Sequence, residues 1–375
     1  AYPTTAGAYS TTNAGLVDIA ISKFNPNGTA LVYSTYIGGN STEAPHSMVV
    51  NSLGQLVILG TTSSPNYPTS GNAYDGIFNN GTAVNYASNG TNFENGSDII
   101  VTVLSADGAS LVGSTFLGGS GNDGLNEDTD LAYNYGDIFR GEVIVDAADN
   151  IYIASSTRSN NFPVTGGTVG QGLGGTQDAC VAKFNPDASN LLWSTFLGGD
   201  NADAGYSLKL NTAGELYVTG GTEGGGFPIV GSTLNTAFQG GDSDGFVVRL
   251  NSAATAIVNS SYIGTGSYDQ TYFVEVDHDD DVYLYGQSEG NYTVTGGVFS
   301  DNGSKQFIQK LSPNLSTSLM STVFGSGSAE VNISPTAFLV DICKRIYVSG
   351  WGGGTNQSWN GAVGTTNGMT TTPDG

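Results

Sequence analysis

The chain has 375 residues, with 33 Asp and Glu against 10 Lys and Arg, so its formal net charge is −23. This charge repels nucleic-acid phosphates and anionic membrane surfaces, so we expect neither as a partner. No run of 18 apolar residues predicts a membrane-spanning helix. The 56 glycines, together with many Asn, Ser and Thr, predict short strands joined by turns.

In chain order, the sequence is organised by a segment that recurs five times. Each copy ends on a Ser-Thr-aromatic group or a variant of it, whose second residue marks the register, at Thr35, Thr115, Thr195, Ser261 and Thr322. A basic residue precedes the marker by a constant spacing in four copies, at Lys23, Lys183, Arg249 and Lys310, whereas Val103 holds this place in the second copy. An acid lies further upstream, at Asp18, Asp98, Asp178 and Asp244, and is replaced by Lys305 in the last copy. The constant spacing predicts a hairpin, such as residues 18–24 and 31–37 around the turn 25–28.

A second hairpin is expected after each marker. Its turn always opens on an Asn or Asp, because such a side chain bonds the backbone two residues further on. These residues are Asn51, Asp146, Asn211, Asp277 and Asp341.

Many predicted strands are apolar on consecutive residues, which indicates burial on both faces. Repeats of four short strands therefore predict an all-β fold, a β-propeller of four-stranded antiparallel blades. A β-sandwich is the alternative, but it does not explain the strict internal period. We expect one propeller domain or propeller segment over residues 1–375, with a half blade at 1–37, full blades at 46–117, 141–197, 206–263 and 271–324, a half blade at 336–350, and a loop or tail at 351–375.

The repeat resembles the bacterial β-propeller repeat family (SBBP repeats). The resemblance rests on strings such as 178–188 and 191–199, on the second hairpins, and on Phe162-Pro163. It implies a large cell-surface or secreted protein, of the kind that gliding bacteria export through the type nine secretion system, some of which are adhesins. The resemblance implies no catalytic residues. Val103, Lys305 and Tyr292-Thr293 depart from the family pattern.

The two ends of the chain predict either a ring of five blades closed by pairing of the terminal half blades, or part of a larger ring. The segment 370–375 resembles the loop at residues 3–5. We therefore expect a segment of a longer polypeptide or a larger assembly.

Two insertions break the regular loop lengths, after Gly60 in the first full repeat and at residues 122–139 in the second. Because both fall on connections that leave the same face of a blade, this face is the expected binding face. The aromatic candidates on it are Tyr86, Phe93, Tyr133 and Tyr135. Deletion of residues 122–139 is expected to leave thermal unfolding nearly unchanged, since the insertion adds no strand to the repeat.

Acidic residues also recur eight positions after each marker, at Glu43, Asp123, Asp203, Asp269 and Glu330. We interpret them as structural carboxylates at the start of each innermost strand, although a ring of them could also gather a cation. The sequence needs no cofactor, but one cluster offers oxygen ligands of the kind that calcium prefers. Its members are Asp123, Asn126, Glu127, Asp128 and Asp130.

The motifs favour a non-enzymatic module, extracellular or at the cell surface, that binds other surface proteins or extracellular glycans. The two histidines, His46 and His278, lie in no nucleophile motif. A glycan-binding lectin that uses Trp193, Trp351 or Trp359 for stacking is the main alternative. A polysaccharide-active enzyme also stays open, because glycoside hydrolysis needs only two carboxylates.

Overall fold

The computed structural model describes residues 2–86, 91–134, 136–327, 331, 333–352, 356–357 and 363–364. Over these ranges the protein is all-β, with one short 3₁₀ turn, η1 (Asp137–Phe139). No helix within them has the length and hydropathy needed to cross a membrane.

Four antiparallel sheets of four strands form the body of the molecule. In every one, the two hairpins of a repeat lie side by side in a single sheet, which contradicts the sandwich alternative. The first sheet contains β3 (Glu43–Val50), β4 (Leu56–Thr62), β7 (Asp98–Leu104) and β8 (Leu111–Leu117); the second β9 (Glu142–Val145), β10 (Ile151–Thr157), β11 (Asp178–Phe184) and β12 (Leu191–Leu197); the third β13 (Asp203–Leu210), β14 (Leu216–Thr222), β15 (Asp244–Leu250) and β16 (Ile257–Ile263); the fourth β17 (Asp269–Val276), β18 (Val282–Ser288), β19 (Gln306–Leu311) and β20 (Ser318–Phe324).

Two-stranded hairpins stand at the two ends of this series. They are β1 (Ile19–Phe24) with β2 (Leu31–Ile37), and β21 (Ile333–Val340) with β22 (Ile346–Gly352). Two smaller pairs are β5 (Val84–Tyr86) with β6 (Thr91–Phe93), and β23 (Asn356–Gln357) with β24 (Val363–Gly364).

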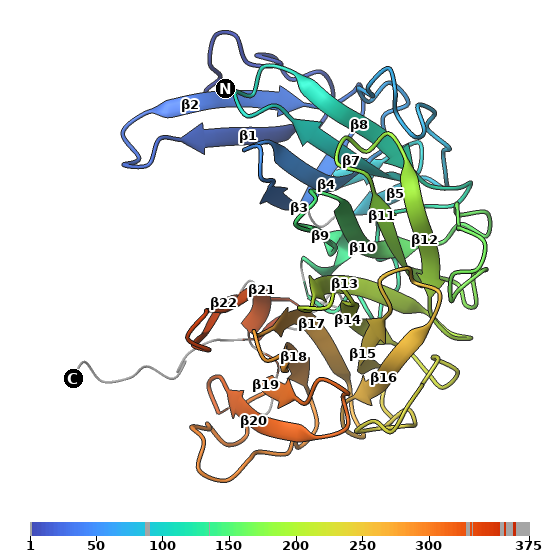
Figure 1. Ribbon diagram of the computed structural model, residues 1–375, viewed down its shortest axis with the longest axis vertical. Coiled ribbons are helices and arrows are strands. Elements are labelled where there is room, and N and C mark those ends of the chain that lie inside the picture. Colours follow the sequence, from blue (N-terminus) through green and yellow to red (C-terminus); the bar gives the residue numbers. More distant parts are fainter. Residues whose placement is uncertain are drawn as a thin grey trace.

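The sheets follow one another around an arc (Figure 1). The first strands of successive sheets, β3, β9, β13, β17 and β21, are neighbours and line its inner side. The hairpins β1–β2 and β21–β22 lie at opposite ends of the arc, so closure of the ring by terminal pairing is not confirmed.

Packing between sheets explains why the strands are apolar on consecutive residues. Residues of the first and second sheets share one buried cluster, which includes Leu59, Val101 and Ile153. The second and third sheets share another, and the third and fourth a further one. Each interior sheet thus buries both faces.

The Asx turns are confirmed. Asn51 Oδ1 accepts hydrogen bonds from the backbone N–H groups of Leu53 and Gln55, at 3.1 and 2.9 Å. The same pair of bonds occurs at Asp146, Asn211, Asp277 and Asp341.

The Ser-Thr marker has a clear physical role, because it fastens the loop that precedes the first strand of its own hairpin. Thr115 Oγ1 accepts from the backbone N–H of Asp75 at 2.8 Å and donates to the Asp75 carbonyl at 3.1 Å. Its neighbour Ser114 donates to the carbonyl of Pro68 at 2.7 Å. The serine-to-proline bond recurs from Ser34, Ser194 and Ser260 to Pro3, Pro163 and Pro228.

The insertion at residues 122–140, here called the plug, differs from the expected exposed loop. It crosses the inner strands, where Leu131 is fully buried against Tyr206 and Tyr272. Asn134 donates to the Tyr272 hydroxyl at 2.7 Å and to Gln287 Oε1 at 2.9 Å. The plug therefore joins the second sheet to the third and fourth.

Candidate functional site

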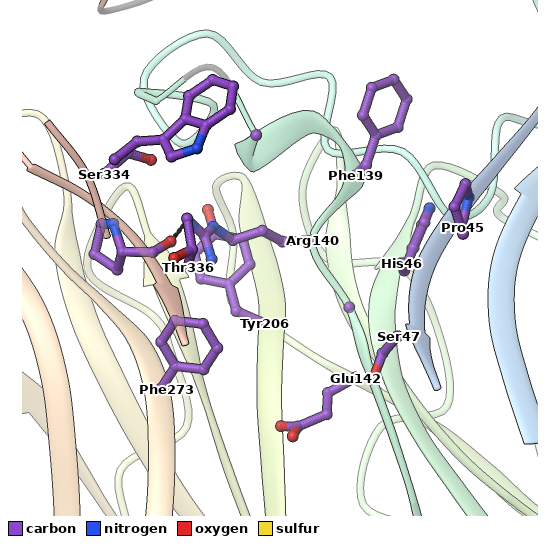
Figure 2. Close-up of a pocket in the computed structure, with 14 residues that line it drawn as sticks. Pro45, His46, Ser47, Phe139, Arg140, Glu142, Tyr206, Phe273, Ser334 and Thr336 are labelled. Carbon is purple, nitrogen blue, oxygen red and sulfur yellow. Dashed lines mark hydrogen bonds between the residues drawn. The ribbon is translucent and has the colours of Figure 1, made fainter. Parts of the chain in front are cut away.

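A cavity of about 500 Å³ lies on the inner side of the arc and is lined by residues from all five innermost strands or the segments that lead into them. Figure 2 shows Phe273 and Thr336 on one side of it, His46 and Pro45 on the other, and Arg140 between them. Five repeats and the plug therefore contribute to this axial cavity.

Arg140, at the end of the plug, is the cationic residue of the cavity wall. Its Nε lies 2.5 Å from Asp137 Oδ1, and its guanidinium lies 4.4 Å from the centre of the Tyr272 ring. A further bond of 2.6 Å runs from Nη2 to the carbonyl of Pro335 in β21. Burial lowers the pKa of Arg140, but the charge and hydrogen bond of Asp137, together with the nearby Tyr272 and Tyr206, outweigh burial, so the net shift is upward. Arg140 thus holds the plug, β17 and β21 together.

Two further titratable side chains of the cavity wall, His46 and Glu142, also make hydrogen bonds. His46 Nε2 lies 3.0 Å from Thr61 Oγ1, and burial lowers the pKa of His46, so the imidazole is neutral at pH 7. Burial also raises the pKa of Glu142, whose Oε2 accepts bonds from Ser207 Oγ and the Leu208 N–H. Among the described residues that line the cavity, Glu142 is the only carboxylate.

Aromatic side chains give the cavity an apolar rim. Trp351, in β22, is 52% exposed and lines the cavity with Phe139 and Phe273. Of the other tryptophans considered for stacking, Trp193 is buried at 6% exposure and packs edge-on against Tyr152. Trp359 lies outside the described residues.

The expected binding-face aromatics are mostly core residues of the insertions. Tyr86 and Phe93 are 5% and 0% exposed, and their rings pack against Phe139 of the plug. They are corrected from surface candidates to core residues, because β5–β6 and the plug bury apolar surface against each other. Tyr133 stacks on Tyr268 with ring centres 4.1 Å apart and donates to Glu289 at 2.6 Å. Tyr135 falls outside the described residues.

The five oxygen donors considered for calcium do not converge. Asp123 accepts bonds from Thr157 and Ser159, Asn126 bonds Tyr206 and Gln177, and Glu127 pairs with Arg158. Only Asp128 and Asp130 come together, and the third member of their group is Glu223. Glu223 follows β14, in the next repeat, so no local spacing could have revealed it.

Burial and the closeness of the carboxylates raise pKa values within the group of Asp128, Asp130 and Glu223. Burial, followed by contact with Asp128, raises the pKa of Glu223 to about 9, and the pKa of Asp130 is raised by burial and by the neighbouring Asp128.

The recurring acids lie at the junctions between sheets, as expected, in the copies that the structure describes. Glu43, Asp123, Asp203 and Asp269 each accept the N–H of the residue four positions earlier. Glu330 is not among the described residues.

A second acid faces each of these junction acids across a glycine. A Cβ at Gly118 would lie 2.5 Å from Asp98 Oδ1 and 2.8 Å from Asp123 Oδ2. The same geometry occurs at Gly38, Gly198 and Gly264. A glycine is therefore needed at this position, three residues after the marker, to admit two carboxylates.

No protein-family model matches the chain, so none supports the resemblance to SBBP repeats, and no curated protein matches it either. Among solved structures, it is similar to a point mutant of NanB sialidase from Streptococcus pneumoniae, with 10% identity, a TM-score of 0.45, and coverage of 94% of this chain and 62% of that chain. A protein of unknown function from Dyadobacter fermentans has 10% identity and a TM-score of 0.38, covering 79% and 70%. PorZ, a bacterial surface component of the type-IX secretion system of Porphyromonas gingivalis, has 10% identity and a TM-score of 0.33, covering 91% and 43%. At these TM-scores the similarities carry no argument about activity.

Proposed function

We propose that the protein is a non-enzymatic binding module of the cell surface or extracellular space, and that the axial cavity is its ligand site. The observation that carries this proposal is the composition of the cavity wall, to which five repeats and the plug contribute. A large pocket with an apolar lining and a few polar groups is the usual form of a ligand site. The acidic composition and the resemblance to surface repeats support the extracellular setting.

The chemistry of the wall favours binding over hydrolysis. Glycoside hydrolysis uses two carboxyl groups about 5–9.5 Å apart across the scissile bond. Glu142 stands alone among the described lining residues and is held by Ser207. His46 is neutral and bonded to Thr61, with no nucleophile in the described lining positioned by it.

A glycan is the ligand class we propose in the first place. Sugars combine an apolar face, which stacks on aromatic rings, with hydroxyl groups that need hydrogen-bonding partners. Trp351 supplies an exposed ring at the rim, and Thr336 lies on the same wall. A protein partner that inserts a loop into the cavity is the second candidate, since the lining includes polar side chains and backbone from both β3 and β21.

A glycan array followed by titration calorimetry tests this proposal. Trp351→Ala should weaken binding of the best glycan by about tenfold to a hundredfold, because stacking and burial of an indole contribute about 1.5–3 kcal/mol. Tyr347→Ala is the matched control, since Tyr347 is equally exposed on β22 but does not line the cavity. Release of reducing sugar from any array hit would contradict the non-enzymatic function.

A further inference from the structure

The two end hairpins occupy complementary halves of a sheet. In every complete sheet the second strand pairs with the third, as β4 does with β7 from Leu56↔Leu104 to Thr62↔Asp98. By chain order β22 is a second strand and β1 is a third strand. In the described residues β22 pairs with β21 alone, and β1 with β2 alone. Each hairpin therefore presents the edge that the other one would complete.

Core positions of the repeat are exposed on both hairpins. Phe24 of β1 is 60% exposed, although its counterparts in the complete sheets are 0% exposed, namely Leu104, Phe184, Leu250 and Leu311. Val348 of β22 is 40% exposed, whereas its counterparts are at most 2% exposed, namely Ile58, Ile153, Val218 and Leu284. Comparison with the same repeat positions shows that both end hairpins carry apolar surface that the described residues leave uncovered.

A polar motif specifies the partner of β22. In the second sheet, Lys183 Nζ lies 4.6 Å from the centre of the Tyr152 ring and 3.4 Å from Asp146 Oδ2. The fourth sheet repeats the motif with Lys310, Tyr283 and Asp277, at 4.8 and 3.4 Å.

The last hairpin contains two parts of this motif. The Tyr347 hydroxyl bonds Asp341 Oδ2 at 3.3 Å, as the tyrosines of the complete motifs bond their acids. The third part, a lysine at the matching place of a third strand, is Lys23 of β1. In the first sheet, where Val103 replaces the lysine, Val57 replaces the tyrosine as well. The tyrosine position of the second strand and the lysine position of the third strand are therefore replaced together. We infer that Tyr347 is matched by a lysine on the strand that pairs with β22.

We propose that β22 of one copy of this chain pairs with β1 of a second copy, in the register Ile346↔Phe24 and Tyr347↔Lys23, and so forms a composite four-stranded sheet between two molecules. This inference is independent of the ligand in the axial cavity. The contact is head-to-tail, because different surfaces meet, so it generates linear arrays or rings of copies.

The structure favours a second copy over closure within one chain. The chain's own β1–β2 hairpin is packed on the first sheet through Ile19 and Ile21, at the far end of the arc. Bonds between the sheets hold the arc in its present curvature, among them the part-buried bond from Arg140 to the carbonyl of Pro335. Bringing the two ends of one chain together would break such bonds, whereas a second copy adds its hairpin without disturbing them.

Site-directed disulfide formation tests both the pairing and its source. In a Cys343→Ser background, one protein carries Ser22→Cys and another carries Val348→Cys. Residues opposite each other in an antiparallel pair lie about 4.5–5.5 Å apart between Cα atoms, which a disulfide can span. The mixed proteins should form a covalent heterodimer on mild oxidation, and Ser22→Cys mixed with Ile346→Cys, two residues out of register, should form several-fold less.

The products of oxidation distinguish pairing of β22 with β1 of a second copy from pairing with β1 of the same chain. With both cysteines in one chain, the proposal predicts covalent dimers and longer arrays. A covalently closed monomer would overturn the second copy in favour of closure within the chain. Absence of any disulfide in either format would overturn the pairing itself.

A charge variant provides a second measurement that does not depend on oxidation. By sedimentation, the wild-type protein should associate with rising concentration, and more so at higher salt, because salt screens the repulsion between chains of charge −23. Lys23→Glu should weaken association by about tenfold, since it places an acid opposite Tyr347 and Asp341. Lys23→Arg is the control and should retain association, because Arg249 lies 5.8 Å from the Tyr217 ring in the third sheet. Equal association of all three proteins would contradict the proposed motif.

Discussion

At the scale of single residues, the paired junction acids have strongly raised pKa values. Burial raises the pKa of Asp98, Asp203 and Asp244 to about 8, and of Asp123 and Asp269 to about 7. Asp98 Oδ1 finds no hydrogen-bond donor among the described residues. A neighbouring carboxylate adds to the shift, as Asp123 does for Asp98. These acids are therefore largely protonated in the folded protein under mildly acidic conditions.

This protonation gives the stability an unusual pH dependence. Between about pH 4 and pH 8 the folded state binds more protons than the unfolded state, so the free energy of unfolding falls as the pH rises. Urea unfolding should show a lower free energy at about pH 8.5 than at about pH 5.5, by more than ~1 kcal/mol.

The Asp98→Asn variant tests whether the junction acids cause this pH dependence of stability. The amide carries no charge to desolvate, so the variant should lose part of the decrease in stability between these two pH values. Asp107→Asn, at an exposed turn, is the control and should leave the decrease unchanged. A free energy of unfolding that is flat or rises over this window would contradict the raised pKa values.

The recurrence of these acids could be predicted from the sequence, because their spacing from the marker is constant. The second acid that faces each of them could not be predicted from the sequence. Asp98 and Asp123 are far apart along the repeat, and only the fold brings their oxygens to the two sides of Gly118. The same reason explains the calcium candidates, where Asp128 and Asp130 meet Glu223 of another repeat instead of their sequence neighbours.

At the scale of elements, strands and turns were predictable because each hairpin carries its own turn chemistry. The plug was not, because it has no counterpart in the other repeats. Its apolar residues Leu125, Leu131 and Ile138 are separated by polar ones and resemble an ordinary loop, yet all three are buried. Apolar residues at intervals in an otherwise polar insertion were the only sequence signal of a packed segment.

We expect the plug to contribute to stability, contrary to the expectation for an exposed loop. Leu131→Ala should lower the free energy of unfolding by about 2–5 kcal/mol, because it opens a cavity against Tyr206 and Tyr272. Thr129→Ala, at an exposed position of the same segment, should change it by less than about 0.5 kcal/mol. If thermal and urea unfolding cannot distinguish the two variants, the plug is an accessory loop.

At the scale of the whole molecule, the arc behaves as a row of similar units whose interior members are stabilised from both sides. In such repeat arrays, stability is approximately the sum of unit and interface contributions. The third sheet packs against neighbours on both faces, with Phe246 and Val247 fully buried. In the part of the chain that the structure describes, each end hairpin packs against one neighbouring sheet. A two-stranded hairpin alone is marginally stable in water.

Hydrogen exchange should therefore vary along the chain. Amides of β21–β22 and β1–β2 should exchange through local opening, many-fold faster than amides of β14–β15, whose exchange requires disruption of two sheet interfaces. The measurement is exchange followed by mass spectrometry at low protein concentration, where copies are apart. Raising the concentration should slow exchange in β22 and β1 selectively, if these strands pair between copies, and leave β14–β15 unchanged. Uniform protection along the arc would instead show that it opens only as one cooperative body, with the end hairpins held as firmly as the interior sheets.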